Sequence, residues 1–238
     1  MLGQKHLPAG QASAVKGPKP EMAEAPFRKG RCSFYIDGFN LYHAIDDLMD
    51  QRLKWVDLGS LCESFLKPGD QLESIDYFTA LNTWDAAKRK RHTAYITALE
   101  QTGIRITKGS FDRPRKFCHT RGEYCRNYSE KKTDVAIAVS IIADGKEDAY
   151  DKAFLISADS DHVPLARRFK QSLPQKILIL ITPPKRYQEA RELVAEVGQS
   201  KVFQLTAGRI RSHPLAPEFR NSKGKLLAAR PVLYGSRP

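Results

Sequence analysis

The stretch FLISADSDHVPLARRF, residues 154–169, contains the change from strand to helix that decides the fold. Its first four residues form an apolar run typical of a buried strand, and two acids, Asp159 and Asp161, follow directly. A helical pattern begins at once, with Pro164 in its first turn, where proline is tolerated. A strand that runs into a helix is the repeating unit of a parallel α/β sheet, and here two carboxylates stand at the carboxyl end of the strand.

The same alternation continues on both sides of this stretch. Short apolar segments predict strands at 32–36, 74–81, 104–111, 153–157, 176–182 and 201–205. Amphipathic segments between them predict helices at 39–50, 57–66, 86–103, 133–145, 163–173 and 186–197, and a long irregular loop is predicted at 112–131. We therefore expect an α/β fold, a three-layer α/β/α sandwich with a central, mostly parallel sheet.

Length and composition suggest one large domain with two tails. The chain has 238 residues, of which 41% are hydrophobic and 28% are charged, as is ordinary for a globular protein. Residues 1–30 are rich in Gly, Ala, Pro and Lys and lack periodicity, so they are predicted to be a disordered basic leader. The domain is expected at 31–205 and a basic C-terminal extension at 206–238. With no long apolar run and no export signal, we expect a cytoplasmic protein with four reduced cysteines.

The net charge of +12 is unevenly distributed. Residues 84–132 contain 13 basic and 5 acidic side chains, a net charge of +8, and residues 205–238 contain 7 and 1, a net charge of +6. The leader adds +3, which leaves the rest of the chain at −5. Basic segments around an acidic core favour a polyanionic partner such as nucleic acid. The alternative is that the charge only improves solubility.

Topology brings acids from three segments to one edge of the predicted sheet. Asp37 follows the first strand, Asp159 and Asp161 follow the fourth, and Asp134 begins a helix whose N-terminus lies at the same edge. Asn40, one helical turn after Asp37, can reach the same place. Other acids belong at the opposite edge, namely Asp76, Asp144, Glu147, Asp148 and Asp151, while Asp85 and Asp112 are weaker candidates.

Gathered carboxylates repel each other unless a positive charge compensates them. A hard divalent cation with oxygen ligands is the natural compensator, and with a polyanionic partner it suits hydrolysis of a phosphodiester. Each residue also has a local alternative: Asp161 as a helix cap, Asp134 at a helix N-terminus, Asp37 in an Asp-Gly turn and Asn40 as a local cap.

Three motifs together, YIDGFNLYH, EKKTDVAIAV and LISADSDHVPLARRF, resemble the NYN-domain proteins, a branch of the PIN-like nuclease superfamily. The resemblance covers about residues 31–205 and implies a PIN-like α/β/α fold whose acidic pocket binds Mg²⁺ or Mn²⁺ and cleaves RNA. By residue match, the metal and catalytic roles fall on Asp37, Asp134, Asp159 and Asp161, with Asn40 beside them in the catalytic set.

Basic residues interleaved with aromatic residues predict an RNA-binding surface near this site. Basic side chains can hold phosphates while aromatic rings stack on unpaired bases. The predicted contacts are Lys88, Arg89, Lys90, Arg91, Arg113, Arg115, Lys116, Tyr124, Lys131 and Lys132. A solvated helix face and loop is the alternative. Cys118, His119 and Cys125 also suggest zinc, but structural zinc normally requires four ligands, commonly in closely spaced pairs.

The sequence therefore predicts a metal-dependent endoribonuclease. His43 and His162 lie near the acids in the sequence, and either could simply line the pocket. Two other functions stay open: a non-catalytic RNA-binding or regulatory module, and a small-molecule phosphohydrolase in which Asp37 is a nucleophile. The RNA target and the oligomeric state are left open.

Overall fold

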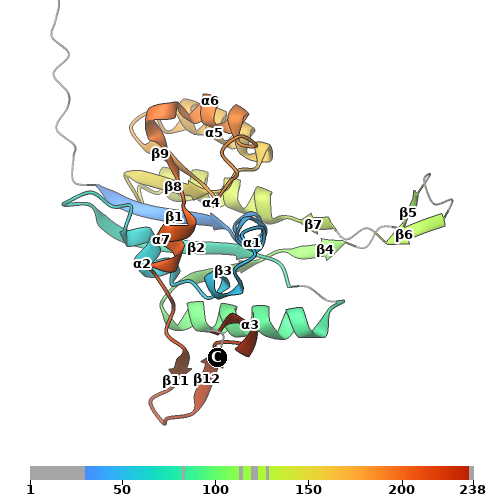
Figure 1. Ribbon diagram of the computed structural model, residues 1–238. Helices are drawn as coiled ribbons and strands as arrows, with labels where there is room; N and C mark the ends of the chain where they lie inside the picture. Colours follow the sequence, from blue (N-terminus) through green and yellow to red (C-terminus); the bar gives the residue numbers. More distant parts are fainter. Residues whose placement is uncertain (1–29, 82–83, 113–114, 119–122, 127–128, 236–238) are drawn as a thin grey trace, which may run out of the picture.

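The computed structural model describes residues 30–81, 84–112, 115–118, 123–126 and 129–235 (Figure 1). Within these residues, six strands form one sheet in the order β10-β9-β8-β1-β2-β3, and every neighbouring pair is parallel. The strands of this sheet are β1 (Arg31–Asp37), β2 (Gln71–Thr79), β3 (Arg105–Lys108), β8 (Lys152–Ile156), β9 (Ile177–Thr182) and β10 (Val202–Gln204). The predicted parallel sheet is confirmed.

Helices cover both faces of this sheet (Figure 1). One face carries α1 (Gly38–Asp46), α2 (Leu58–Glu63), α3 (Ala86–Gln101) and α7 (Ala207–Arg211), and the other carries α4 (Thr133–Lys146), α5 (Val163–Ser172) and α6 (Arg191–Val197). Short 3₁₀ turns are η1 (Gln51–Lys54), η2 (Ser160–His162), η3 (Gln199–Lys201) and η4 (Val232–Tyr234). The three-layer α/β/α fold is therefore confirmed.

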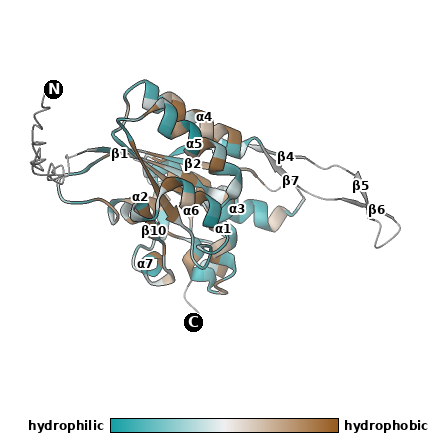
Figure 2. Ribbon diagram, turned by 90° about the horizontal axis from the view of Figure 1, so that it is seen from above, coloured by the Kyte–Doolittle hydropathy of each residue, from teal (hydrophilic) through white to brown (hydrophobic). Residues whose placement is uncertain are grey.

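Two hydrophobic cores lie between these layers, one on each face of the sheet. Strand β1 contributes to both, because successive side chains of a strand point to opposite faces. Phe34 packs in the core beneath α1 to α3, whereas Tyr35 packs in the core beneath α4 to α6. In Figure 2 the helices show hydrophobic and hydrophilic stripes, as expected of helices that cover a sheet.

The direction of chain growth reverses between β1 and β8. From β1 the chain builds outward through β2 and β3 on one side, and from β8 it builds outward through β9 and β10 on the other. Loops that leave the two central strands diverge at such a point and open a crevice at their carboxyl ends, where α/β proteins bind ligands. The residues that follow β1 and β8 are therefore the first place to look for a site.

The predicted loop at 112–131 is wrong in its secondary structure. Its described residues form β4 (Ser110–Asp112), β5 (Arg115–Cys118), β6 (Glu123–Arg126) and β7 (Ser129–Lys131). These strands pair antiparallel, β4 with β7 and β5 with β6, and project from the domain as an arm (Figures 1 and 2). Strands this short and charged have no apolar alternation, which is the signal that sequence analysis depends on.

Two further elements are shorter than predicted. The strand expected at 104–111 is divided at Gly109, whose N–H bonds to the carbonyl oxygen of Thr79, and its second half leaves the sheet to form β4. The helix expected at 186–197 begins only at Arg191. Turns precede it, with Lys185 at a positive φ of 63°, a conformation that no α-helix accommodates.

The residues after β10 pack against the domain. Strands β11 (Glu218–Arg220) and β12 (Leu226–Ala229) form a hairpin beside α3, and Tyr234 of η4 is buried beyond it (Figure 1). The proposed division at 205 and 206 stays a prediction, and the predicted leader lies outside the described residues except for Gly30. In the part of the chain that the structure describes, every helix is too short or too polar to cross a membrane.

Candidate functional site: an acidic crevice with a buried histidine

Asp37 ends β1 and at the same time caps α1. Its Oδ1 accepts a hydrogen bond from the backbone N–H of Asn40 at 2.9 Å, and the residue is only 4% exposed. The next residue must be glycine, because a Cβ atom on Gly38 would lie 2.4 Å from the ring of Tyr77. Asp37 therefore caps α1 instead of forming the Asp-Gly turn that was its local alternative, and its Oδ2 is left to face the crevice groups described next.

Two side chains join the ends of β1 and β8. The hydroxyl group of Ser157 donates to Asp37 Oδ2 at 2.9 Å and accepts from the N–H of Asp159 at 3.1 Å. Asn40 Oδ1 accepts from the N–H of Ala158 at 3.0 Å. Asn40 thus acts as a tie between α1 and the loop after β8. These bonds hold the loops in a fixed relation across the switch point of the sheet.

Asp134 reaches the same crevice from the first turn of α4. One of its carboxylate oxygens, one of Asp37 and a ring nitrogen of His162 lie within 4.8 Å of one another. His162 Nε2 is 3.7 Å from Asp37 Oδ2 and 3.9 Å from Asp134 Oδ1. His162 is 1% exposed, and neither of its ring nitrogens has a hydrogen-bond partner among the described residues.

Asp159 and Asp161 flank this group without joining it. Asp159 Oδ1 accepts the N–H of Asp161 at 3.0 Å, so Asp159 is the residue that caps the short η2 turn. The alternative that Asp161 caps the following helix is wrong, since α5 starts after His162 and has no side-chain cap. Asp161 is exposed. Asp37 and Asp134 thus form the centre of the site, and the other two acids lie at its edge.

The electrostatic state of Asp134 reflects this crowding. Burial raises the pKa of Asp134, and three neighbouring carboxylates raise it further, while His162 acts in the opposite direction. The three carboxylates belong to Asp37, Asp159 and Asp161. The charges of the other three predicted acids therefore act on Asp134 at one edge of the sheet, and a bound cation would relieve this repulsion.

The acids assigned to the opposite edge lie there, and Asp148, Asp151 and Asp76 are paired with basic side chains. Arg31, the first residue of β1, bonds to Asp148 at 3.0 Å and to Asp151 at 3.1 Å. Asp76 accepts two hydrogen bonds from the guanidinium group of Arg105, at 2.7 and 2.6 Å. Of the weaker candidates, Asp85 caps α3, and the side chain of Asp112 lies outside the described residues.

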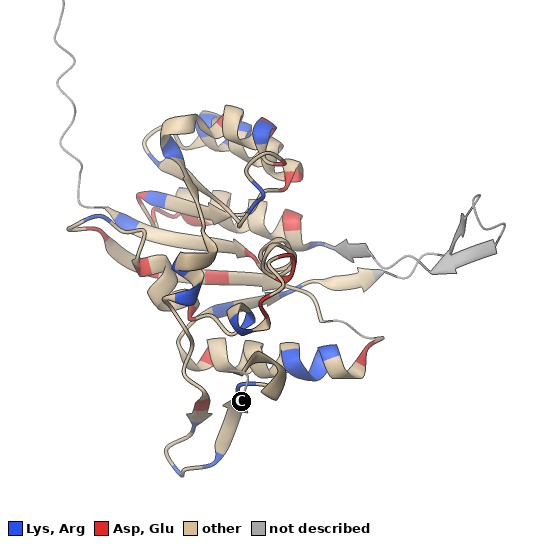
Figure 3. Cartoon of the chain, in the orientation of Figure 1, with Lys and Arg blue, Asp and Glu red and all other residues tan. Residues whose placement is uncertain are grey.

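The predicted RNA contacts are distributed over two regions. Lys88, Arg89, Lys90 and Arg91 lie on the N-terminal half of α3 (Figure 3), and Lys132 is exposed just before α4. Arg115, Lys116, Tyr124 and Lys131 are in the strands of the arm, but their side chains lie outside the described residues, as does all of Arg113. The zinc alternative cannot be assessed geometrically, because the side chains of Cys118, His119 and Cys125 are outside as well.

The groups at the centre fit a divalent cation. Carboxylate oxygens suit Mg²⁺ and Mn²⁺, and a neutral imidazole nitrogen is a common ligand for first-row transition metals. The decisive observation is His162, because a buried ring with two unpartnered nitrogens is costly unless something binds it. The cluster therefore has the donor set of a divalent-metal site, without identifying the ion.

Sequence reasoning did not assign Ser157 or His162 to the site. Ser157 looked like the last residue of a strand, and only the bond to Asp37 reveals its role. His162 adjoins Asp161 in the sequence, but its burial depends on the turn of η2, which no periodicity predicts. The signal that could have identified both was the compact run of polar residues immediately after an apolar strand.

Comparisons with known proteins agree with this architecture. The family model of the NYN domain matches residues 31–199. The fold also matches the crystal structure of a protein of unknown function from Vibrio parahaemolyticus, with a TM-score of 0.50 and 16% identity over 77% of this chain and 97% of that chain. A search of curated proteins gave no match. The chain belongs to the NYN domain family, a family of nuclease-type domains.

Proposed function

We propose that the protein is a metal-dependent ribonuclease that hydrolyses phosphodiester bonds of RNA in the crevice between β1 and β8. The observation that supports this most strongly is the group formed by Asp37, Asp134 and His162, with atoms within 4.8 Å of one another at the switch point of the sheet. Membership of a nuclease-type family supports the reaction class. The basic α3 and the basic arm support a polymeric anion as the substrate.

Each residue has a distinct task in this proposal. Asp37 and Asp134 would hold Mg²⁺ or Mn²⁺, with Asp159 and Asp161 adding negative charge at the edge of the site. Bound there, the ion supplies a nucleophile at neutral pH and neutralises charge on the phosphate. Ser157 keeps Asp37 Oδ2 oriented, and Asn40 keeps the loop after β8 against α1. His162 adds a nitrogen ligand from the buried side of the cluster.

The proposal is tested by cleavage of a mixed RNA pool by the purified full chain, with Mn²⁺ or Mg²⁺ and with EDTA, followed by sequencing of the cut ends. Cleavage should require the metal. Asp37→Asn and Asp134→Asn should each reduce it more than about 100-fold, because Asn keeps the size of the side chain but removes the charge that holds a hard cation.

The matched control is Asp144→Asn, which makes the same change at the other end of α4, on the opposite edge of the sheet. This variant should retain cleavage. If the three variants cut RNA equally well, the activity does not come from this crevice. RNA binding without metal-dependent cleavage would identify a non-catalytic binding module, and a phosphorylated Asp37 would identify a phosphohydrolase.

A further inference from the structure

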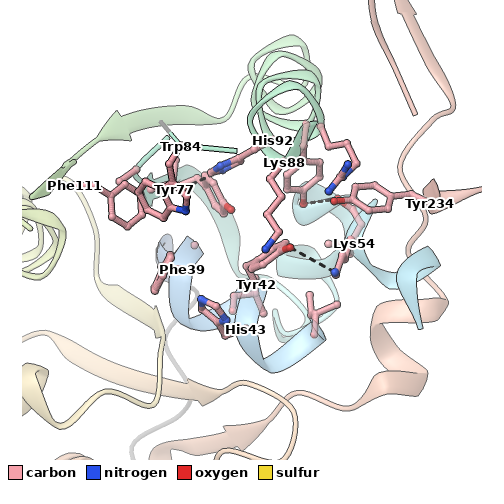
Figure 4. Close-up of a pocket in the computed structure, with 18 residues that line it drawn as sticks. Phe39, Tyr42, His43, Lys54, Tyr77, Trp84, Lys88, His92, Phe111 and Tyr234 are labelled. Carbon is pink, nitrogen blue, oxygen red and sulfur yellow. Dashed lines mark hydrogen bonds between the residues drawn. The ribbon is translucent and has the colours of Figure 1, made fainter. Parts of the chain in front are cut away.

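A cavity of about 210 Å³ begins at Gly38, one residue after Asp37 (Figure 4). It lies between α1 and α3, with Gly38 and Phe39 at the start of α1 on one side and Lys88 and His92 of α3 on the other. Both helices start at the carboxyl edge of the sheet, because α1 follows β1 and α3 follows β2. The cavity therefore lies at the same edge of the sheet as the acidic crevice. It is lined by residues of β2 and by none of β8.

Aromatic rings form a continuous row along this cavity. Trp84 contacts Phe111 edge to face, with ring centroids 4.9 Å apart, and Phe111 contacts Phe39 at 5.8 Å. Phe39 in turn contacts the ring of His43 at 4.4 Å. Phe39 and Trp84 are 38% and 39% exposed, so part of each ring is open to solvent. A row of solvent-exposed aromatic rings can serve as a platform on which unpaired bases stack.

Basic side chains border the same cavity. Lys88 and Arg91 of α3 line it, whereas their neighbours Arg89 and Lys90 do not. Lys88 is exposed and extends toward Tyr42 across the cavity (Figure 4). Polar groups deeper in the cavity are already paired: Lys54 with Asp46, and the ring of His92 with the hydroxyl group of Thr79 at 3.1 Å. The other side chains along the cavity are mainly aromatic, with Lys88 and Arg91 among its basic lining residues.

We propose that this cavity binds an unpaired nucleotide of the RNA strand, with its base stacked on the row from Trp84 to Phe39 and its phosphate beside Lys88 and Arg91. The assignment rests on the proposed ribonuclease function for the identity of the polymer. Stacking rings together with nearby cations suit a single strand, because the bases of a duplex are already stacked on each other. The cavity would make the enzyme select unpaired RNA and would fix the position of the strand relative to Asp37.

The test measures binding in EDTA, so that cleavage does not interfere. A short fluorescein-labelled single-stranded RNA and the same strand annealed to its complement are titrated with the full chain. Trp84→Ala should weaken binding of the single strand about tenfold and change duplex binding little. Trp84→Phe, which keeps an aromatic face, should restore binding. Tryptophan fluorescence gives a direct readout, because the chain has two tryptophans and Trp55 is only 1% exposed.

Two charge-matched double variants on α3 distinguish binding of a phosphate at this cavity from non-specific attraction between the basic helix and RNA. Lys88→Gln with Arg91→Gln should lower the slope of log affinity against log salt by about 1.4, or about 0.7 for each phosphate contact that is lost. Arg89→Gln with Lys90→Gln removes the same charge from outside the cavity and should change the slope less. Circular dichroism checks that each variant is folded.

The proposal is overturned if both pairs lose affinity equally, if Trp84→Ala weakens duplex and single strand alike, or if single-stranded RNA leaves the tryptophan fluorescence unchanged. In the last case the groove is a site for an apolar peptide or another ligand. Single-strand binding that depends on Trp84 in a protein that does not cleave RNA would refute the nuclease proposal and leave this binding site intact. If the protein cleaves RNA and Trp84→Ala leaves single-strand binding unchanged, the binding site is refuted and the nuclease proposal stands.

Discussion

The two edges of the central sheet both carry clusters of acids, and they differ in what faces those acids. At the amino edge, where the strands begin, acids lie against Arg31, Lys152, Lys176 and Arg105, with Asp70 in contact with Lys152 at 2.6 Å. At the carboxyl edge, His162 is the only basic side chain within 4.0 Å of the Asp37 and Asp134 carboxylates among the described residues, and Asp159 and Asp161 have no ion pair there.

This difference separates a structural role from a chemical one. Paired acids at the amino edge attach strands and helices to each other, and their charge is neutralised within the chain. At the carboxyl edge, Asp37 and Asp159 are fixed by hydrogen bonds from Ser157 and from backbone N–H groups, which orient a carboxylate but leave its charge in place. A cluster that is oriented but not neutralised is suited to an external cation.

The largest effect is expected at the amino edge. Lys152 and Asp70 form an ion pair with side chains that are 9% and 5% exposed. Lys152→Met would leave the Asp70 carboxylate buried without its cation, and we expect a loss of about 3–5 kcal/mol in the free energy of unfolding, measured by urea denaturation. The double variant with Asp70→Asn should recover much of this loss. A small loss in the single variant would mean that the amino edge is not held by its pairs.

Acid sensitivity provides the next test, through a partly buried histidine near the carboxyl edge. Burial lowers the pKa of His92 to about 4, below its usual 6.5. Between these pH values the unfolded chain binds a proton that the folded protein does not, so stability should fall as the pH falls, by up to about 1.4 kcal/mol per pH unit. His92→Gln should flatten this part of the profile of unfolding free energy against pH. An unchanged profile would assign the acid sensitivity to other groups.

A smaller effect, on metal affinity, is expected when a carboxylate at the carboxyl edge is kept but loses a hydrogen bond that orients it. Ser157→Ala deletes the hydroxyl group that bonds to Asp37 Oδ2 and to the N–H of Asp159. Changes at residues that orient metal ligands typically cost about 10- to 100-fold in metal affinity, and we expect a loss in that range for Mn²⁺ by calorimetric titration. Ser74→Ala, which removes a hydroxyl bonded to Ser33 near the amino edge, is the control and should bind Mn²⁺ normally.

The sequence predicted the layers, the parallel sheet and the acids at its carboxyl edge. These features depend on the periodicity of apolar residues and on the alternation of strands with helices. It did not predict which acids meet. Asp161 was the acid considered as a helix cap, yet Asp159 caps η2 and Asp161 is exposed, because this depends on a turn of three residues. The aromatic row was missed for a related reason. Phe39, Trp84 and Phe111 are far apart in the chain, so no local sequence pattern shows that their rings meet.

The smallest effect is expected when Asp is replaced by Asn at either end of α4. The two variants should change the free energy of unfolding in opposite directions. Its two acids differ in their surroundings. Asp144 accepts a hydrogen bond of 2.7 Å from the hydroxyl group of Tyr35, and its carboxylate is 4.0 Å from Arg105. Asp144→Asn keeps an acceptor but loses the charge, so we expect a loss of about 1 kcal/mol in the free energy of unfolding. Asp134, in contrast, has a raised pKa, caused first by burial and then by neighbouring carboxylates.

A carboxyl group with a raised pKa makes the folded state less stable once the pH is high enough to ionise it. Asp134→Asn removes that charge, so in EDTA at neutral pH we expect a gain, limited to about 0.5 kcal/mol because the side chain is half exposed and solvent screens its charge. The gain should disappear in acid, where Asp134 is protonated, and saturating Mn²⁺ should reverse the order by stabilising the parent protein but not the Asp134→Asn variant. Urea denaturation of the parent and both variants measures the loss at Asp144, the gain at Asp134 in EDTA and the reversal of that gain in Mn²⁺. A loss at Asp134 in EDTA equal to that at Asp144 would show that the carboxyl edge is neutralised within the chain, as the amino edge is.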